Sequence, residues 1–293
     1  MFQTNHPVPD TQTFLPNTQI EIVNEKAPRG DFEYALFDFD GTISVLREGW
    51  PEIMAPLMVE MVSGDQPPPE GIGKRVEEFI DETTGIQTIL QMEGLVEMVR
   101  EYGLVPEDEI KDAQGYKAIY NERLLKPVYA RRDKLTSGDP SYTLEQATMA
   151  GSLDFLKKLS ERGLTLILAS GTDREYVLEE AKITTAAQYF NGGMFGALKT
   201  FEEYSKDKVI KQILADFDLQ GGQLMVFGDG PVELRNAKDN GAVAVGVASD
   251  EVACRGWNMD KRDRLIRAGA DIMIPDFAEG DRLLKYLFAE DRS

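Results

Sequence analysis

Residues 35–42 of the chain read ALFDFDGT, an apolar run that ends in two aspartates, Asp38 and Asp40, separated by one residue. The apolar part is typical of a buried strand, and ligands of open α/β sheets bind beyond the carboxyl ends of the strands. Both carboxylates reach a substrate if the chain turns after the first, and Gly41 permits that turn. One carboxylate then serves as a nucleophile and the other as an acid/base group. An ordinary Asp/Gly turn is the alternative for these residues taken alone.

Four further apolar runs are typical of buried parallel strands, and helical patterns lie between them. The five strands expected in this way are 35–37, 164–169, 224–227, 242–247 and 272–274. Helices are expected at 153–159, 209–214 and 232–240. Alternation of strand and helix predicts an α/β fold with a doubly wound parallel sheet.

Residues 44–145 carry no comparable strand pattern and are expected to form a mainly helical domain inserted into the α/β core. The helices expected there are 51–62, 72–82, 86–102 and 107–126, with breaks at prolines 67–69 and at 83–85. The core is then expected to comprise residues 1–43 and 146–293, with 1–30 as an N-terminal extension that adds a strand at 20–23. Hinges between the two domains are expected near 44–47 and 136–140.

Two more motifs follow expected strands. Ser170 and Gly171 come directly after the second strand, where a hydroxyl, backbone N–H groups and the start of a helix near Asp173 suit phosphate oxygens. A plain helix N-cap is the alternative. Asp229 and Glu233 follow the third core strand, four residues apart, and this spacing lets both carboxylates approach one Mg²⁺ ion. An acidic helix start is the alternative there.

Two lysines, Lys206 and Lys208, precede the helix expected at 209–214. Either ammonium group is able to offset the gathered carboxylates and bind a phosphate, although a surface lysine is the usual explanation for such a residue.

Taken together and in this order, the motifs resemble those of the haloacid dehalogenase (HAD) superfamily of aspartate-nucleophile phosphotransferases, over residues 34–43 and 147–288. Members similar to β-phosphoglucomutase and phosphoglycolate phosphatase carry a helical cap between the first and second motifs, where residues 44–145 lie. The resemblance implies that Asp38 attacks phosphorus and that Asp40 protonates the leaving oxygen and then activates water.

The same resemblance implies Mg²⁺ as the cofactor, held by Asp38, the backbone carbonyl of Asp40, Asp229 and Glu233. Glutamate stands at 233 where the superfamily more commonly has aspartate, which leaves direct ligation by this residue open.

The resemblance also assigns phosphate binding. Ser170 and the N–H groups beside it, including that of Gly171, would bind the phosphoryl oxygens together with Lys206 or Lys208. The resemblance favours Lys206, because Ser205 and Lys206 precede the helix by the spacing that the family often shows.

Asp40 separates the chain from the dehalogenases, which lack an acid/base aspartate two residues after the nucleophile. We therefore expect a Mg²⁺-dependent phosphatase acting on a small phosphorylated metabolite, with a sugar phosphate as the favoured substrate. A phosphomutase of the β-phosphoglucomutase type and a non-catalytic phosphometabolite-binding protein are the alternatives.

Substrate contacts are expected from the inserted domain. Arg47 and Trp50 follow the nucleophile loop closely, and Thr84 and Gln87 lie at an expected loop and helix start. A polar substrate group would be bound by Arg47, a ring would stack on Trp50, and Thr84 and Gln87 would contact a polyol. Hinge packing and helix capping explain Trp50 and Thr84 equally well.

Bulk composition narrows the remaining classes. The 293 residues include 51 acidic and 32 basic side chains, for a formal net charge of −19, which argues against nucleic acid and anionic membranes as partners. One cysteine permits no internal disulfide, and the single histidine, His6, excludes a His-centred triad. The polar first 16 residues lack the apolar core of a signal peptide, so a cytoplasmic location is expected. A monomer or homodimer is the expected oligomeric state.

Overall fold

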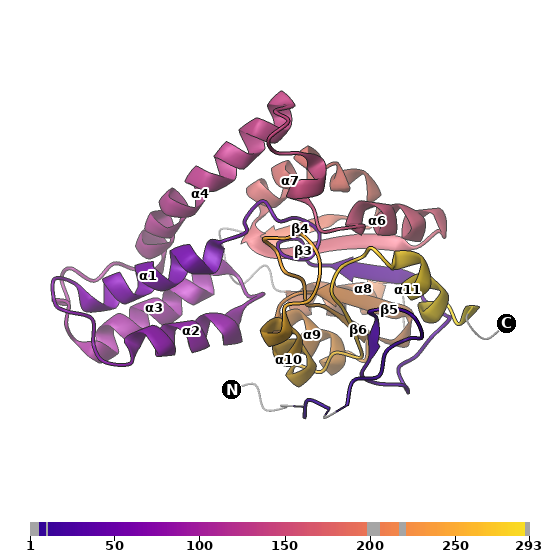
Figure 1. Cartoon of the computed structure of the whole chain (residues 1–293). Coiled ribbons are helices and arrows are strands. Elements are labelled where there is room, and N and C mark those ends of the chain that lie inside the picture. Colours follow the sequence, from indigo (N-terminus) through magenta and orange to yellow (C-terminus); the bar gives the residue numbers. More distant parts are fainter. Residues whose placement is uncertain (1–5, 10, 198–205, 217–220, 291–293) are drawn as a thin grey trace.

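The computed structural model describes residues 6–9, 11–197, 206–216 and 221–290. Its centre is a seven-stranded sheet in the order β1-β7-β6-β5-β2-β3-β4 (Figure 1). Every neighbouring pair is parallel except β1 and β7, which are antiparallel. The strands are β1 (Glu21–Ile22), β2 (Tyr34–Phe37), β3 (Thr165–Asp173), β4 (Met194–Ala197), β5 (Leu224–Gly228), β6 (Val243–Val247) and β7 (Ile272–Ile274).

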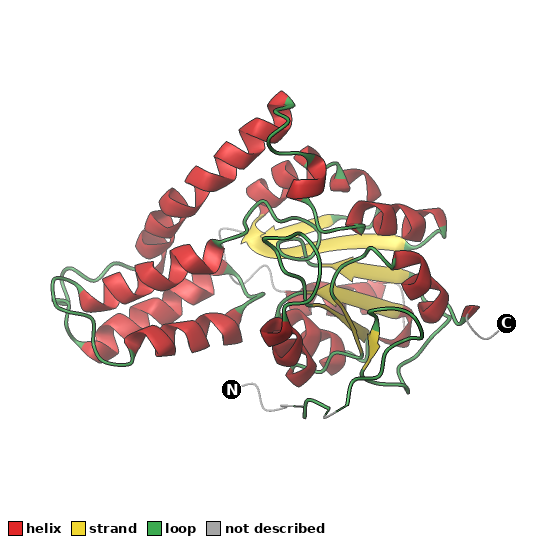
Figure 2. Cartoon of the chain, viewed as in Figure 1, coloured by secondary structure: helices red, strands yellow, loops and turns green. Residues whose placement is uncertain are grey.

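Helices cover both faces of this sheet (Figure 2). Side chains of β2 alternate between the faces, because successive residues of a strand point to opposite sides. Ala35 and Phe37 pack with α6 (Ser152–Glu161), α7 (Arg174–Ile183) and α11 (Gly280–Leu287). Tyr34 and Leu36 pack with α8 (Lys206–Asp216), α9 (Pro231–Asp239) and α10 (Met259–Arg267). The doubly wound α/β fold expected from the sequence is therefore confirmed.

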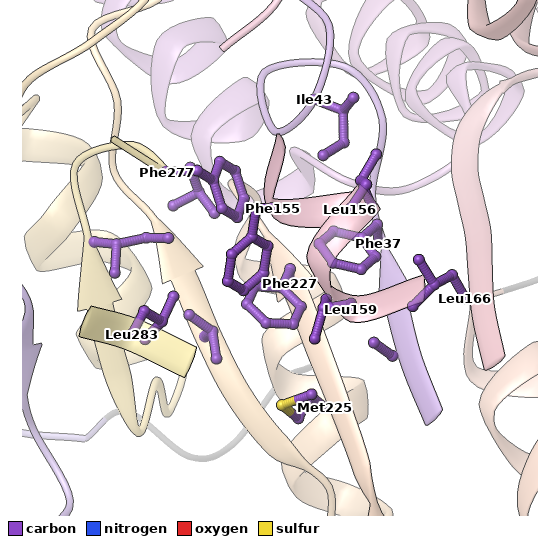
Figure 3. Packing of buried hydrophobic residues seen from close by; sticks show 14 of the residues in the cluster. Phe37, Ile43, Phe155, Leu156, Leu159, Leu166, Met225, Phe227, Phe277 and Leu283 are labelled. Atoms are coloured by element: carbon purple, nitrogen blue, oxygen red, sulfur yellow. The ribbon is translucent and has the colours of Figure 1, made fainter. Parts of the chain in front are cut away.

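Aromatic side chains fill the centre of the first face (Figure 3). The rings of Phe37 and Phe227 are stacked with centroids 4.5 Å apart, and Phe155 meets Phe227 edge-on at 5.5 Å. Burial of each such ring contributes on the order of 2 kcal/mol. Since Phe37 and Phe227 directly precede the chemistry-bearing loops of β2 and β5, this packing fixes where those loops begin.

Residues 50–137 form four helices that share a separate apolar cluster: α1 (Trp50–Ser63), α2 (Ile72–Thr83), α3 (Thr88–Tyr102) and α4 (Ala113–Ser137). They lie beyond the ends of the strands, and α4 runs back toward α7 (Figure 1). Two ion pairs bridge to the sheet-covering helices, Arg132 with Glu179 of α7 and Asp81 with Arg264 of α10. A short helix, α5 (Leu144–Ala147), leads back to α6.

Some boundaries differ from those expected. The fourth helix was placed at 107–126, but α4 begins at Ala113, where the Asp112 side chain accepts a hydrogen bond from the N–H of Gly115 (2.8 Å). It then continues through Pro127 to Ser137 and ends at Gly138, whose φ is 72°. Strand β4 was not expected, and β1 is the short strand expected at 20–23.

Candidate active site

Asp38 lies directly after β2, in the middle of the sheet, and its N–H donates to the carbonyl of Phe227 (2.9 Å). Its carboxylate is buried and accepts a hydrogen bond from the ammonium group of Lys206, with Nζ 2.7 Å from Oδ1. Burial raises the pKa of Asp38 well above its ordinary value, the Lys206 charge opposes that rise, and nearby Glu233 and Asp229 add to it. A further cation at this point would favour the ionised carboxylate that a nucleophile requires.

Asp40 faces the same pocket from the loop that follows. Its Oδ2 accepts hydrogen bonds from the hydroxyls of Ser170 (3.2 Å) and Thr172 (2.9 Å), which lie at the end of β3. Its other oxygen, Oδ1, is buried, accepts no hydrogen bond from a described residue, and lies 3.6 Å from Nε of Arg47. The first and second motifs are thus joined directly, because β2 and β3 are neighbours in the sheet.

Asp38, Asp229 and Glu233 form a buried carboxylate cluster, in which one oxygen from each side chain lies within 4.8 Å of the others. Asp229 follows β5, and Glu233 lies in the first turn of α9, where its Oε1 accepts a hydrogen bond from the N–H of Gly230 (2.7 Å). Oε2 of Glu233 is 3.3 Å from Nζ of Lys206. Three hard oxygen donors around one point are the ligand set that Mg²⁺ prefers.

The loop after Asp38 packs tightly on this cluster. The hydroxyl of Thr42 is 3.4 Å from Oδ1 of Asp229. Gly41 has a φ of 74°, and a Cβ atom there would lie 2.2 Å from Oδ2 of Asp229. Glycine is therefore required both for the turn and for the approach of the two loops.

A second lysine, Lys261 of α10, also contacts the carboxylate cluster, and no sequence motif predicted it. Its buried Nζ is 3.0 Å from Oδ2 of Asp229 and 2.7 Å from Oε1 of Glu251. Burial lowers the pKa of Lys261, but the two carboxylates outweigh burial and the net shift is upward. Burial raises the pKa of Glu251, and Lys261 opposes that rise. The cluster therefore has one cation on each side, Lys206 and Lys261.

One pocket opens onto Asp38 and is walled by the helices of residues 50–137. Arg47, Trp50 and Thr84 line it, as do Ser170, Gly171 and Lys206. Gln87 is buried but does not line the pocket, and Lys208 is exposed and does not line it either. Of the two lysines considered from the sequence, Lys206 is the one that the fold brings to Asp38.

Arg47 is already bound on the core side. Its guanidinium donates two hydrogen bonds to the fully buried Glu180 of α7, at 3.0 and 2.7 Å, and lies over the ring of Tyr176. Thr84 ends α2 and its hydroxyl donates to the carbonyl of Ile80 (2.9 Å). Both side chains therefore bind groups of the protein while lining the pocket, and the substrate contacts expected for them stay predictions.

Helix α4 supplies wall residues that no sequence motif indicated: Lys117, Tyr120, Asn121 and Leu124. Lys117 pairs with Asp173 at the end of β3, at 2.5 Å. Tyr120 is buried, and burial raises the pKa of its hydroxyl above the ordinary value. The sequence indicated only a helix in this region, and an expected helix by itself does not distinguish a pocket wall from a core.

The loop between α2 and α3 touches the motif loops at two glycines. A Cβ atom on Gly171 would lie 2.2 Å from the carbonyl oxygen of Ile86, and one on Gly85 would lie 2.0 Å from Oε2 of Glu233. Real Cβ atoms do not approach other atoms this closely. The absence of side chains at Gly85 and Gly171 therefore allows residues 84–86 to cover the pocket.

No helix among the described residues is both long and apolar enough to cross a lipid bilayer. A comparison with curated proteins finds no match. Many solved structures share the fold. A predicted phosphoglycolate phosphatase from Haemophilus somnus has 15% sequence identity and a TM-score of 0.57, with 86% of this chain and 98% of that chain covered.

A β-phosphoglucomutase from Clostridium difficile has 14% identity and a TM-score of 0.56, with 89% and 96% of the two chains covered. At such identities these likenesses establish the fold. The family model for haloacid dehalogenase-like hydrolases matches residues 32–241, a range that contains Asp38, Asp40, Ser170, Lys206, Asp229 and Glu233. The chain therefore belongs to the haloacid dehalogenase-like hydrolase family.

Proposed function

We propose that this hydrolase is a Mg²⁺-dependent phosphatase that cleaves a small phosphate monoester through an aspartyl-phosphate on Asp38. The observation that carries the proposal is the contact set of Asp38, whose carboxylate meets Lys206 at 2.7 Å and forms one cluster with Asp229 and Glu233. An acid/base candidate, Asp40, lines the same pocket.

The donor set fits Mg²⁺. Asp38, Asp229 and Glu233 would hold the ion together with the backbone carbonyl of Asp40, and each side chain is buried. Together with Glu251, which pairs with Lys261, the three carboxylates of this cluster face the two ammonium groups of Lys206 and Lys261. Four ionised carboxylates against two cations leave an excess of two negative charges. When bound, the ion would neutralise that excess and the charge that develops on the phosphoryl group.

The residues divide the reaction into two steps. An oxygen of Asp38 attacks phosphorus while Asp40 gives its proton to the leaving oxygen, so that one alcohol departs and the phosphoryl group stays on Asp38. Asp40 then takes a proton from water, which attacks phosphorus and releases inorganic phosphate. Ser170, the N–H of Gly171 and Lys206 would hold the phosphoryl oxygens throughout.

Residues 44–145 act in this proposal as a cap on a core made of residues 1–43 and 146–293. The loop at Gly85 covers the pocket and would exclude water during the attack on phosphorus. Trp50 lines the pocket, where its ring would pack on the substrate.

The test is release of phosphate from an aryl phosphate, with and without Mg²⁺. Asp38→Asn is expected to lower kcat by at least about a thousandfold, because an amide cannot form the acyl-phosphate. Asp65→Asn, at an exposed position of the cap, is the matched control and should retain wild-type activity. Metal-independent release by the wild type, or full activity of Asp38→Asn, would contradict the proposal.

A further inference from the structure

The positive charges that line the outer part of the pocket are already used by the protein. The Arg47 guanidinium donates two hydrogen bonds to Glu180, and its Nε atom lies 3.6 Å from Oδ1 of Asp40. Lys117 is paired with Asp173 at 2.5 Å. Taking Arg47 from its partner would leave a fully buried carboxylate without its cation, which is strongly unfavourable. Among the described lining residues, Lys206 at the phosphoryl site is the remaining cation, and it already contacts Asp38 and Glu233.

Neutral polar groups and ring faces make up much of the rest of this outer pocket. The Thr88 hydroxyl and the Asn121 amide line it, and neither makes a side-chain hydrogen bond to another residue that the structure describes. Three aromatic residues, Trp50, Tyr120 and Tyr176, line the same pocket. Hydroxyl and amide groups suit the hydroxyls of a ligand, and ring faces suit its C–H surface.

An anionic leaving group would enter a pocket whose field already opposes it. The lining contains the carboxylates of Asp38, Asp40, Asp173 and Asp229 against the cations of Arg47, Lys117 and Lys206. A bound Mg²⁺ ion would add two positive charges, and the phosphoryl group of the substrate, with a charge of about −2, would offset them. A second phosphate or a carboxylate would have to separate an existing ion pair or remain without a partner, and both cost binding free energy. An uncharged alcohol meets neither cost.

We infer that the substrate is the monophosphate of an uncharged, polyhydroxylated alcohol, a sugar or polyol, and that the pocket rejects substrates with a carboxylate or a second phosphate. This inference rests on the proposed phosphatase function and names its substrate class. Thr88 and Asn121 would bind the hydroxyls, and the ring of Trp50 would pack on the carbon skeleton.

Matched substrates test the inference directly. Glycerol phosphate and phosphoglycerate differ in one terminal group, a hydroxymethyl in the first and a carboxylate in the second. Glucose phosphate and phosphogluconate form a similar pair. For each pair, kcat/KM of the member without the carboxylate is expected to exceed kcat/KM of the acid by at least about tenfold. This factor is the effect of one uncompensated polar group. Equal values, or a preference for the acids, would overturn the inference.

Two variants test the residues that carry it. Asp173→Asn releases Lys117 from its partner, so the preference for glycerol phosphate over phosphoglycerate should fall at least about threefold as the freed ammonium accepts the carboxylate. An unchanged preference would overturn the role given to this ion pair.

Asn121→Ala should lower kcat/KM for glycerol phosphate by about tenfold more than it lowers kcat/KM for an aryl phosphate, which has no hydroxyls. Gln114→Ala, which removes an exposed amide from the same helix, is the control and should change neither. Equal losses on both substrates would show that Asn121 does not read hydroxyls.

Failure of the phosphatase proposal would be recognised separately, because it predicts Mg²⁺-dependent hydrolysis of the aryl phosphate itself. If that reaction is absent, thermal stabilisation by glycerol phosphate compared with phosphoglycerate still reports the preference of the pocket. Stronger stabilisation by glycerol phosphate would support the inference, and stronger stabilisation by phosphoglycerate would overturn it.

Discussion

Replacing Gly171 by alanine would put a methyl group into the contact between the end of β3 and the loop that covers the pocket. The new Cβ atom would lie 2.2 Å from the carbonyl oxygen of Ile86, whereas ordinary contacts of this kind begin at 3.4 Å. Gly171 is not among the glycines with positive φ, so alanine fits its backbone without strain. The substitution therefore perturbs the contact and leaves the local conformation intact.

The size of the effect follows from this distance. To accept the methyl group, the carbonyl of Ile86 must retreat by about 1 Å, and a misplacement of this size costs on the order of a hundredfold in rate. We expect Gly171→Ala to lower kcat/KM for an aryl phosphate by about that factor. Stability should change little, since the loop moves outward and no core side chain is lost.

The assay combines initial rates with hydrogen exchange. Amides of residues 84–88 should exchange faster in Gly171→Ala than in the wild type, because the loop no longer seats on the core. Gly73→Ala is the matched control, since a Cβ atom there has nothing within 4 Å and lies on helix α2 of the same helical segment. It should leave both measurements unchanged.

Activity of Gly171→Ala within about threefold of wild type would refute the reasoning. A displacement of the Ile86 carbonyl by about 1 Å would then not matter to the reaction. A hundredfold loss without faster exchange at 84–88 would refute the displacement of the loop and place the effect of the methyl group in the pocket itself.

Three further outcomes follow from the same geometry. Lys206→Met should lower kcat on an aryl phosphate by at least about a hundredfold, since its ammonium offsets the nucleophile, while Lys208→Met, two residues on and exposed, should stay near wild type in the same assay. Lys261→Met leaves the buried carboxylate of Asp229 facing the partly buried carboxylate of Glu251 and should lower the free energy of unfolding of the metal-free protein by about 3 kcal/mol, with part of the loss restored by Mg²⁺ in denaturant titrations; an unchanged midpoint would contradict this. Addition of Mg²⁺ and a metal fluoride should alter hydrogen exchange at 44–47 and 136–140, and identical exchange would argue against hinges there.

The parallel strands were predictable because they are buried on both faces and therefore read as continuous apolar runs. All five strands expected from such runs are present, as β2, β3, β5, β6 and β7. Strand β4 was not predicted because Met194–Ala197 is short, contains Gly196, and pairs at the edge of the sheet. Its register with β3 is also irregular, so it owes its form to its neighbour more than to its own residues.

Helix α4 shows where a local rule fails. Proline normally ends a helix at the preceding residue, and Lys126 was the expected end. The structure instead carries the helix past Pro127, with Val128 and Arg132 buried in the next turns. Tertiary packing of that far half against α7, including the Arg132–Glu179 pair, is information that a local pattern does not contain.

The candidate site also contains some residues that local sequence patterns predict and others that only tertiary packing brings in. Asp38 and Asp229 each follow a strand and Ser170 lies at the end of β3. Parallel strands bring their carboxyl ends to one edge, so the proximity of these residues could be anticipated. Asn121 and Lys261 lie in helices α4 and α10, and no sequence spacing relates either residue to the end of a strand. The catalytic and metal roles remain predictions, which the variants above test.

The short antiparallel pairing of β1 with β7 has a practical consequence for anyone shortening this chain. Glu21 and Ile22 cover the outer edge of β7, and Arg262 is joined to Glu21 by a buried ion pair. The family match begins at residue 32 and stops at 241, before β6 and β7. A fragment cut to those limits would expose the apolar edge of β5, and one that lacks only residues 1–30 would expose β7. Open apolar edges recruit strands from other chains, so both fragments should aggregate more readily than the longer chain.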